Sequence, residues 1–288
     1  MKKIIFASIV CFFAANSVWA NQTRMGIFMA GDYIDDLVNI DIYPHRIAAY
    51  ENNLYGDVTA GSGDYGIILT PDIKYGALAC WQNAVPDNGF NIGYGINLRK
   101  FDIGISGSPV KDHLRFGIGV GRTYFDKRFD LSFLMSDAIN EEWYKFNLRL
   151  SKRKGDFVIV PKYTLNHAKV PYEYNRHRIG IMLQRLILNE GFVYFIAEYD
   201  FSRGDIENDY THIYAGLELP VTKTIVLLFG IKENFINGFE SPEWQIEPGI
   251  SIRIREFSFD FHLNEERLFD KEVTLFESFG LDLNFGKF

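Results

Sequence analysis

Alternation of apolar and polar residues returns through most of this chain, in runs of about ten residues. Residues 114–121 read LRFGIGVG and residues 257–263 read FSFDFHL. Successive side chains of a strand point to opposite faces, so each run describes a strand with one apolar face and one polar face. About ten residues is also the length that a tilted strand needs to cross the apolar part of a bilayer. The pattern predicts an all-β fold.

A soluble β-sandwich would alternate in the same way, with its outer face in water and its inner face in the core. Two features of these runs favour a membrane barrel instead. The polar faces place glycine beside Arg, Lys, Glu and Asp, as the crowded wet lumen of a barrel would require. The apolar faces are rich in Phe and Ile over long consecutive strands. We therefore predict a transmembrane antiparallel up-and-down β-barrel.

The first twenty residues have the three parts of a secretory signal peptide. Lys2 and Lys3 precede an apolar run from Ile4 to Ala15, and small residues lead to Ala20, after which we expect cleavage. The alternative is a retained anchor helix, but the apolar run is short for a membrane span. Cys80 is then the single cysteine of the exported chain, which leaves no partner for an intrachain disulfide.

Charge and hydropathy narrow the class further. Removal of Lys2 and Lys3 takes the formal net charge from -7 to -9, and a mildly acidic chain without a basic block argues against a nucleic-acid partner. Apolar residues make up 47% of the chain, yet the mean hydropathy is only -0.07, so apolar and polar residues are interleaved. After the signal peptide no apolar run is long enough for a transmembrane helix.

The breaks between the runs indicate a meander. Some are tight, such as Arg99–Lys100, and others are longer and polar, such as 166–175 and 202–209. We expect about fourteen strands, within a range of 12 to 16, because bacterial barrels prefer even numbers. No linker divides the chain, so residues 46–288 are expected to form one barrel. Residues 21–45 precede it, as a plug or as a periplasmic extension.

The chain ends in FGLDLNFGKF, whose apolar side resembles the terminal strand of Gram-negative outer-membrane β-barrel proteins. This resemblance implies an outer-membrane location, contact with outer-membrane lipid and recognition by the barrel-assembly machinery. In that class the last strand pairs with the first, so that no edge remains. The expected assembly signal consists of Phe279, Leu281, Leu283, Phe285 and Phe288, of which Phe288 is out of phase with the others.

Fourteen strands behind an N-terminal segment are also similar to the long-chain fatty-acid transporter family and to the shuttle barrels of type IX secretion. The Asn-Pro-Ala motif that those families often carry is absent from this sequence. The narrower resemblance therefore rests on strand number and segment order.

The polar faces carry charges of both signs, so the lumen is not predicted to be a selective ring of one charge. This mixture favours a passive channel or transporter for small or amphipathic molecules. The alternative is a non-conducting structural or secretion-associated barrel that binds a periplasmic or secreted protein. The side chains expected to line the lumen are Arg99, Arg115, Lys145, Arg149, Glu198, Asp200, Glu247, Arg253, Asp260 and His262.

Some outer-membrane barrels are hydrolases, and their motifs can be sought here. None of the six histidines is followed two residues later by Ser, the pair that barrel lipid hydrolases use. Asp260 and His262 have the Asp-x-His spacing of omptin-type proteases, but we interpret them as part of a luminal hydrogen-bond network. The histidines are scattered singly and Cys80 is alone, so no metal and no cofactor is expected. The sequence predicts a protein without enzymatic activity.

Overall fold

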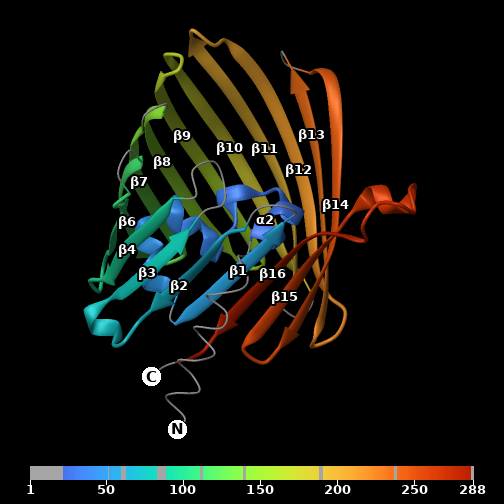
Figure 1. Cartoon of the computed structure of the whole chain (residues 1–288), viewed down its shortest axis with the longest axis horizontal. Coiled ribbons are helices and arrows are strands. Elements are labelled where there is room, and N and C mark those ends of the chain that lie inside the picture. Colours follow the sequence, from blue (N-terminus) through green and yellow to red (C-terminus); the bar gives the residue numbers. More distant parts are fainter. Residues whose placement is uncertain are drawn as a thin grey trace.

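In the computed structural model the strands form a closed barrel (Figure 1). The structure describes residues 22–50, 52–59, 63–82, 89–110, 113–138, 141–187, 191–236 and 239–286; the expected signal peptide, residues 1–20, and Phe288 lie outside them. Within these ranges sixteen strands each pair antiparallel with the next, and β16 pairs with β1. The predicted up-and-down barrel and the pairing of its last strand with its first are confirmed. The number of strands is at the upper end of the expected range of 12 to 16, and it differs from the fourteen of the fatty-acid transporter group.

The strands run in chain order around the wall. Their bounds are β1(Asn53–Thr59), β2(Tyr65–Leu69), β3(Ala77–Gln82), β4(Phe90–Asn97), β5(Asp102–Ser108), β6(His113–Tyr124), β7(Lys127–Ala138), β8(Glu141–Lys154), β9(Phe157–Val170), β10(Tyr174–Ile187), β11(Gly191–Gly204), β12(Asn208–Pro220), β13(Ile225–Ile236), β14(Glu240–Ile254), β15(Phe257–Leu263) and β16(Phe276–Asn284). The helical elements are α2(Gln22–Phe28), η1(Gly31–Tyr33), η2(Leu37–Asp41), η3(Pro44–Ala49), η4(Ile73–Tyr75) and η6(Glu265–Leu268).

Burial follows the alternation seen in the sequence. On β11, Val193, Phe195 and Tyr199 face outward and are 40%, 46% and 40% exposed, whereas Glu198 and Asp200 face inward and are 4% and 1% exposed. The outer surface is therefore a broad apolar belt, the surface that a barrel presents to lipid. Closure satisfies every strand edge, which a bilayer requires because it offers no water to an unpaired backbone group.

The wall is uneven in height. The strands from β8 to β14 have 12 to 15 residues, whereas β1 to β5 have 5 to 8. In Figure 1 the long strands rise well above the side formed by β1 to β3. Residues 202–209 were expected to form a loop, but β11 extends to Gly204 and β12 begins at Asn208, so part of this range belongs to the long strands. We call the rim where β1 begins and β16 ends the terminal rim, and the opposite one the loop rim.

Residues 22–50, here called the luminal segment, lie inside the barrel (Figure 1). Helix α2 packs on β12 to β16 and β1, and η3 packs on β3 to β6. The wall begins at Asn53, later than the expected boundary at residue 46, and residues 46–49 belong to η3. None of the described helices is long and apolar enough to cross a membrane.

Two apolar clusters hold the luminal segment against the wall. One joins Met25, Ile27, Phe28, Ala30, Tyr33 and Ile34 to Val160, Met182, Phe192, Tyr194, Ile196, Tyr214, Val226 and Leu228. The other joins Leu37, Ile40 and Ile47 to Tyr55, Ile68, Ala77, Ala79 and Trp81. The apolar core of this protein thus lies within the lumen, and burial of these side chains is what keeps the segment there.

Glycines on the luminal face make room for η3. A Cβ atom added to Gly104 would collide with the backbone of Pro44 and His45, and one added to Gly119 would collide with His45 Nδ1. Glycine in a strand often marks the close approach of another backbone. The lack of a side chain at both positions therefore lets η3 lie directly against the wall.

Candidate functional site

Asp32 of the luminal segment and Lys162 of β9 form a buried ion pair. Lys162 Nζ lies 2.6 Å from Asp32 Oδ1 and 3.5 Å from Glu198 Oε2. The Tyr43 hydroxyl donates a second hydrogen bond to Asp32, at 3.0 Å, and the Tyr33 hydroxyl donates one to Glu198, at 2.9 Å. Burial alone would raise the pKa of Asp32, but the positive charges of Lys162, Lys145 and Arg149 outweigh it and hold that pKa well below its usual range. Asp32 is therefore a charged anchor.

Arg149 of β8 makes a second connection. Its Nη2 lies 2.8 Å from Asp130 Oδ2 and 3.1 Å from Asp35 Oδ1, and its Nη1 donates to the Asp32 carbonyl at 2.8 Å. The guanidinium also lies over the Tyr43 ring, 4.6 Å from the ring centre. Asp130 in turn accepts a hydrogen bond from His45 Nε2 at 2.8 Å. The wall residues therefore hold η1 and η3 through one continuous network.

Polar contacts also bind the beginning of the luminal segment to the wall, at strands β1, β12 and β16. Arg24 bridges Asp36 and Glu218, at 2.6 Å from each. Thr23 donates its backbone N–H to Asp57 at 2.7 Å, and its hydroxyl lies 3.0 Å from the Ser278 hydroxyl. These contacts join α2 to β1, β12 and β16, so polar bonds as well as apolar packing position the segment.

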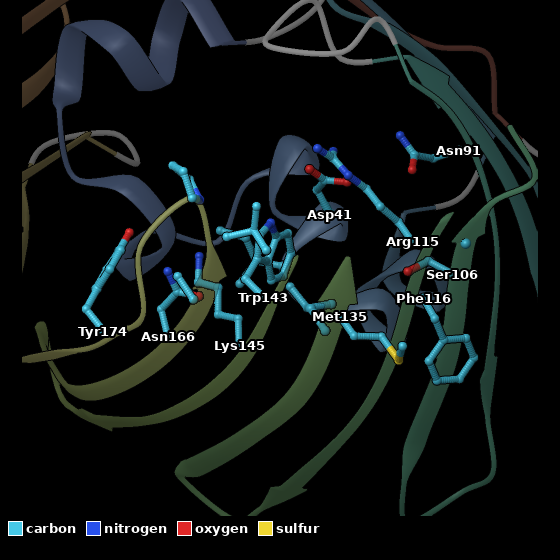
Figure 2. A pocket seen from close by; sticks show the side chains of 16 residues that line it. Asp41, Asn91, Ser106, Arg115, Phe116, Met135, Trp143, Lys145, Asn166 and Tyr174 are labelled. Carbon is cyan, nitrogen blue, oxygen red and sulfur yellow. The ribbon is translucent and has the colours of Figure 1, made fainter. Parts of the chain in front are cut away.

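A cavity of about 530 Å³ remains open between the luminal segment and the wall near the loop rim (Figure 2). Its volume is in the range of small-molecule sites. Its charged lining residues are Arg115, Lys145 and Asp41, and Figure 2 shows Arg115 and Asp41 lying close together. The full lining consists of Asp41, Ile42, Asn91, Ser106, Gly107, Arg115, Phe116, Leu134, Met135, Trp143, Lys145, Asn166, Ala168, Val170, Pro171 and Tyr174.

The Asp260 and His262 pair does not form the contact that catalysis would need. His262 Nε2 is hydrogen-bonded to Glu247 of β14, and its Nδ1 lies 3.6 Å from Glu277 of β16. Asp260 is fully buried, and no hydrogen bond joins it to His262 in the described part of the chain. The ligand atoms of Glu247, His262 and Glu277 lie within 4.8 Å of one another, so these residues form the group best arranged for a metal ion among those described.

Comparison with known proteins agrees with this geometry. No protein-family model and no curated protein matches the chain. Among solved structures, a porin refined at 1.8 Å aligns with 77% of this chain and 81% of its own, at 10% identity and a TM-score of 0.51. A bacterial polysaccharide outer membrane secretin aligns with 81% and 97%, at 8% identity and a TM-score of 0.51.

A third match is a loop L8 deletion mutant of OmpT, an outer membrane protein of Vibrio cholerae. It aligns with 81% of this chain and 96% of its own, at 10% identity and a TM-score of 0.50. The fold is that of an outer-membrane β-barrel. At these identities the likeness concerns the fold alone, because one fold serves many functions.

Nine of the ten predicted lumen residues of this outer-membrane β-barrel have buried or half-buried side chains on the inner face of the wall: Arg115, Lys145, Arg149, Glu198, Asp200, Glu247, Arg253, Asp260 and His262. The tenth, Arg99, does not line the lumen. It is exposed in the turn between β4 and β5, where its φ is 62°. The prediction for Arg99 is wrong because β4 ends at Asn97, whereas the alternation in the sequence continues to Arg99.

Four residues of the expected assembly signal, Phe279, Leu281, Leu283 and Phe285, lie along and just beyond β16, and Phe288 is outside the described residues. Ser278 and Gly280 face the lumen, so Phe279, Leu281 and Leu283 are on the outer phase, with Phe279 5.0 Å from the Phe261 ring. Phe285 lies beyond the end of β16 and donates its N–H to Asn52 at 3.1 Å. Recognition of this end by the assembly machinery stays a prediction.

Sequence reasoning did not find the luminal partners Asp32, Asp35, Asp36 and His45. A signal for them was present in the wall. Residues 157–161, 191–196 and 225–229 read FVIVP, GFVYFI and IVLLF, with apolar residues on both faces of the strand. Such strands are buried on both sides. An apolar inner face in a barrel indicates that something apolar fills the lumen beside it.

Proposed function

We propose that this protein is an outer-membrane channel or transporter for small or amphipathic solutes, whose lumen is closed by its own residues 22–50. Solutes pass only when this luminal segment moves. The observation that carries the proposal is the continuous filling of the lumen from α2 to η3 by two apolar clusters and a network of ion pairs. The terminal rim faces the periplasm and the loop rim faces outward, as the resemblance of the last strand implies.

The two kinds of contact have different consequences for opening. Apolar packing favours the closed state in proportion to the area that it removes from water. Buried ion pairs add less, because their charges regain hydration when the pair separates in water. When water enters from the cavity, the ion pairs among Asp32, Lys162 and Arg149 therefore separate before the apolar contacts do. The cavity at the loop rim serves as the entrance.

Binding rather than catalysis fits this arrangement. His262 is held between two glutamates and is not oriented by Asp260, so the pair with omptin-like spacing does not supply an activated base. We propose no enzymatic activity. Purified protein incubated with lipid and peptide substrates should show no turnover, and turnover that disappears in His262→Ala would contradict this.

Single-channel recording in planar bilayers tests the closure. The whole chain should be closed for most of the time, and a variant lacking residues 22–50 should conduct continuously. Heat-modifiable migration on gels verifies that each protein is a folded barrel. Continuous conductance by the whole chain would refute the proposal. Silence of both folded proteins would instead favour a barrel that binds a partner protein.

A further inference from the structure

The cavity near the loop rim has an ordered inner wall made by three neighbouring strands. Trp143 of β8 and Tyr174 of β10 both lie opposite Ala168 of β9 in the strand register. Two residues deeper, Lys145 lies opposite Asn166. All five residues line the cavity, and Figure 2 shows the side chains of Trp143, Lys145, Asn166 and Tyr174 in it. Ala168, whose side chain is small, separates the two aromatic residues in the strand register, and we call the part of the cavity beside these three residues the slot.

The polar end of this slot carries Lys145, which forms no ion pair with a described residue, although Asp41 also lines the cavity. Among the described residues, no carboxylate lies within 4 Å of Lys145 Nζ, whereas Lys162, Arg149, Arg176, Arg178 and Arg253 are all paired in the lumen. Asn166 Oδ1 is buried and has no hydrogen-bond partner. An amide presents donors on one side and an acceptor on the other, and the two are interchanged by a simple flip. Lys145 and Asn166 together form an unsatisfied polar pair beside an open space.

We propose that this cavity binds an amphipathic carboxylate, with its carboxylate on Lys145 and Asn166 and its apolar body in the slot between Trp143 and Tyr174. A single ammonium group matches a single negative charge, and a charge-assisted hydrogen bond is stronger than a neutral one. Aromatic side chains beside a small residue accept a flat or narrow apolar group. The proposal rests on the proposed function in that it names the solute class, but binding itself does not depend on conduction.

The test is isothermal titration calorimetry of the whole folded chain in detergent. The two probes are 3-phenylpropanoate and 3-phenylpropanamide, which differ in charge and hardly in shape. We expect the acid to bind at least about tenfold more tightly than the amide. Lys145→Gln should remove this preference. Lys100→Gln, at an exposed lysine in the turn between β4 and β5, should leave it unchanged.

A second variant tests the slot without touching the charge. Ala168→Leu fills the space between the aromatic residues and should weaken both probes, by about tenfold or more. It also keeps the test decisive if Lys145→Gln does not fold, which heat-modifiable migration would show. Equal affinity of the unmodified chain for acid and amide, or the same loss in Lys100→Gln as in Lys145→Gln, would overturn the proposal.

The outcomes also separate this inference from the proposed function. Tight and selective binding of the acid by a barrel that never conducts would refute the channel and leave the site intact. Conductance through a barrel that does not distinguish acid from amide would refute the site and leave the channel intact.

Discussion

Lys162 Nζ and Asp32 Oδ1, separated by 130 positions in the chain, lie 2.6 Å apart in the middle of the lumen. The lysine belongs to the wall and the aspartate to the luminal segment, and both are almost completely buried. The ammonium group also lies over the Tyr33 ring, 4.1 Å from the ring centre. This pair joins the two parts of the molecule at the point where the lumen is closed.

Replacing Lys162 by Gln should loosen the luminal segment. The substitution leaves Asp32 and Glu198 buried without their shared cation, and loss of one partner of a buried pair costs about 3–5 kcal/mol. We expect a lower urea midpoint in detergent and more frequent channel openings. The double variant Asp32→Asn/Lys162→Gln should recover part of the loss, and Lys100→Gln should behave like the unmodified protein. A single variant as stable as the control would show that the pair does not hold the segment.

Gly119 should not tolerate a methyl group. In Gly119→Ala the new Cβ atom would overlap His45 Nδ1, so η3 must shift, and overpacking of this kind costs about 1–3 kcal/mol. Gly89→Ala is the matched control, because nothing lies within 4 Å of a Cβ atom at that position. Thermal unfolding of the two variants gives the comparison. Equal midpoints would mean that η3 is not seated against β6 as described.

Low pH should destabilise the packing of η3 against the wall, because His45 becomes protonated. Burial lowers the pKa of His45, the hydrogen bond to Asp130 opposes this effect, and the positive charges of Arg128 and Arg46 add to it. A folded state whose histidine pKa is depressed binds fewer protons than the unfolded chain, so stability falls as the pH drops through the unfolded value of about 6.5. The urea midpoint should therefore decrease between pH 7.5 and pH 5. His45→Gln should show a smaller decrease, and identical pH profiles would contradict the assignment.

Arginine at the outward position Ile181 should impair the barrel. This residue lies near the middle of β10 and is 42% exposed on the apolar belt. A charged side chain on the lipid face costs about 2–4 kcal/mol at the bilayer midplane. Ile181→Arg should fold less efficiently into lipid vesicles than Ile181→Ala, which removes a similar apolar contact without adding charge. Equal folding yields would place this face away from lipid.

The wall was predictable because each long strand repeats its alternation several times. Arg149 and Glu198 were assigned to the lumen on that basis, and both lie there. The short strands were harder, since β2 has only five residues and so offers few repeats. For this reason the sequence predicts about fourteen strands, fewer than the sixteen of the structure. At Arg99 the alternation of the sequence continues beyond the end of the strand, so a turn residue was predicted to line the lumen.

The closure of the lumen could not be read from the same pattern. The luminal residues Asp32, Asp35 and Tyr43 belong to a segment without helical or strand periodicity. Lys162 and Arg149, the wall residues that bind Asp32 and Asp35, lie more than a hundred positions further along the chain. Periodicity reveals which face a side chain takes, but not what meets it across a lumen. The sequence leaves residues 21–45 as either a plug or a periplasmic extension, and the doubly apolar strands, such as IVLLF at 225–229, favour the plug.

A reversible disulfide that fixes the luminal segment to the wall tests whether movement of this segment opens the lumen. The Thr23 and Ser278 hydroxyl oxygens lie 3.0 Å apart, so cysteines at these positions in a Cys80→Ser background are close enough to form a disulfide between α2 and β16. Single-channel recordings would compare the oxidised protein with the same protein after reduction, and each single-cysteine variant serves as a control. We predict that the oxidised protein stays closed and that reduction restores openings. Equal conductance of the verified oxidised and reduced forms would contradict this prediction, because the lumen would then conduct with the segment fixed in place.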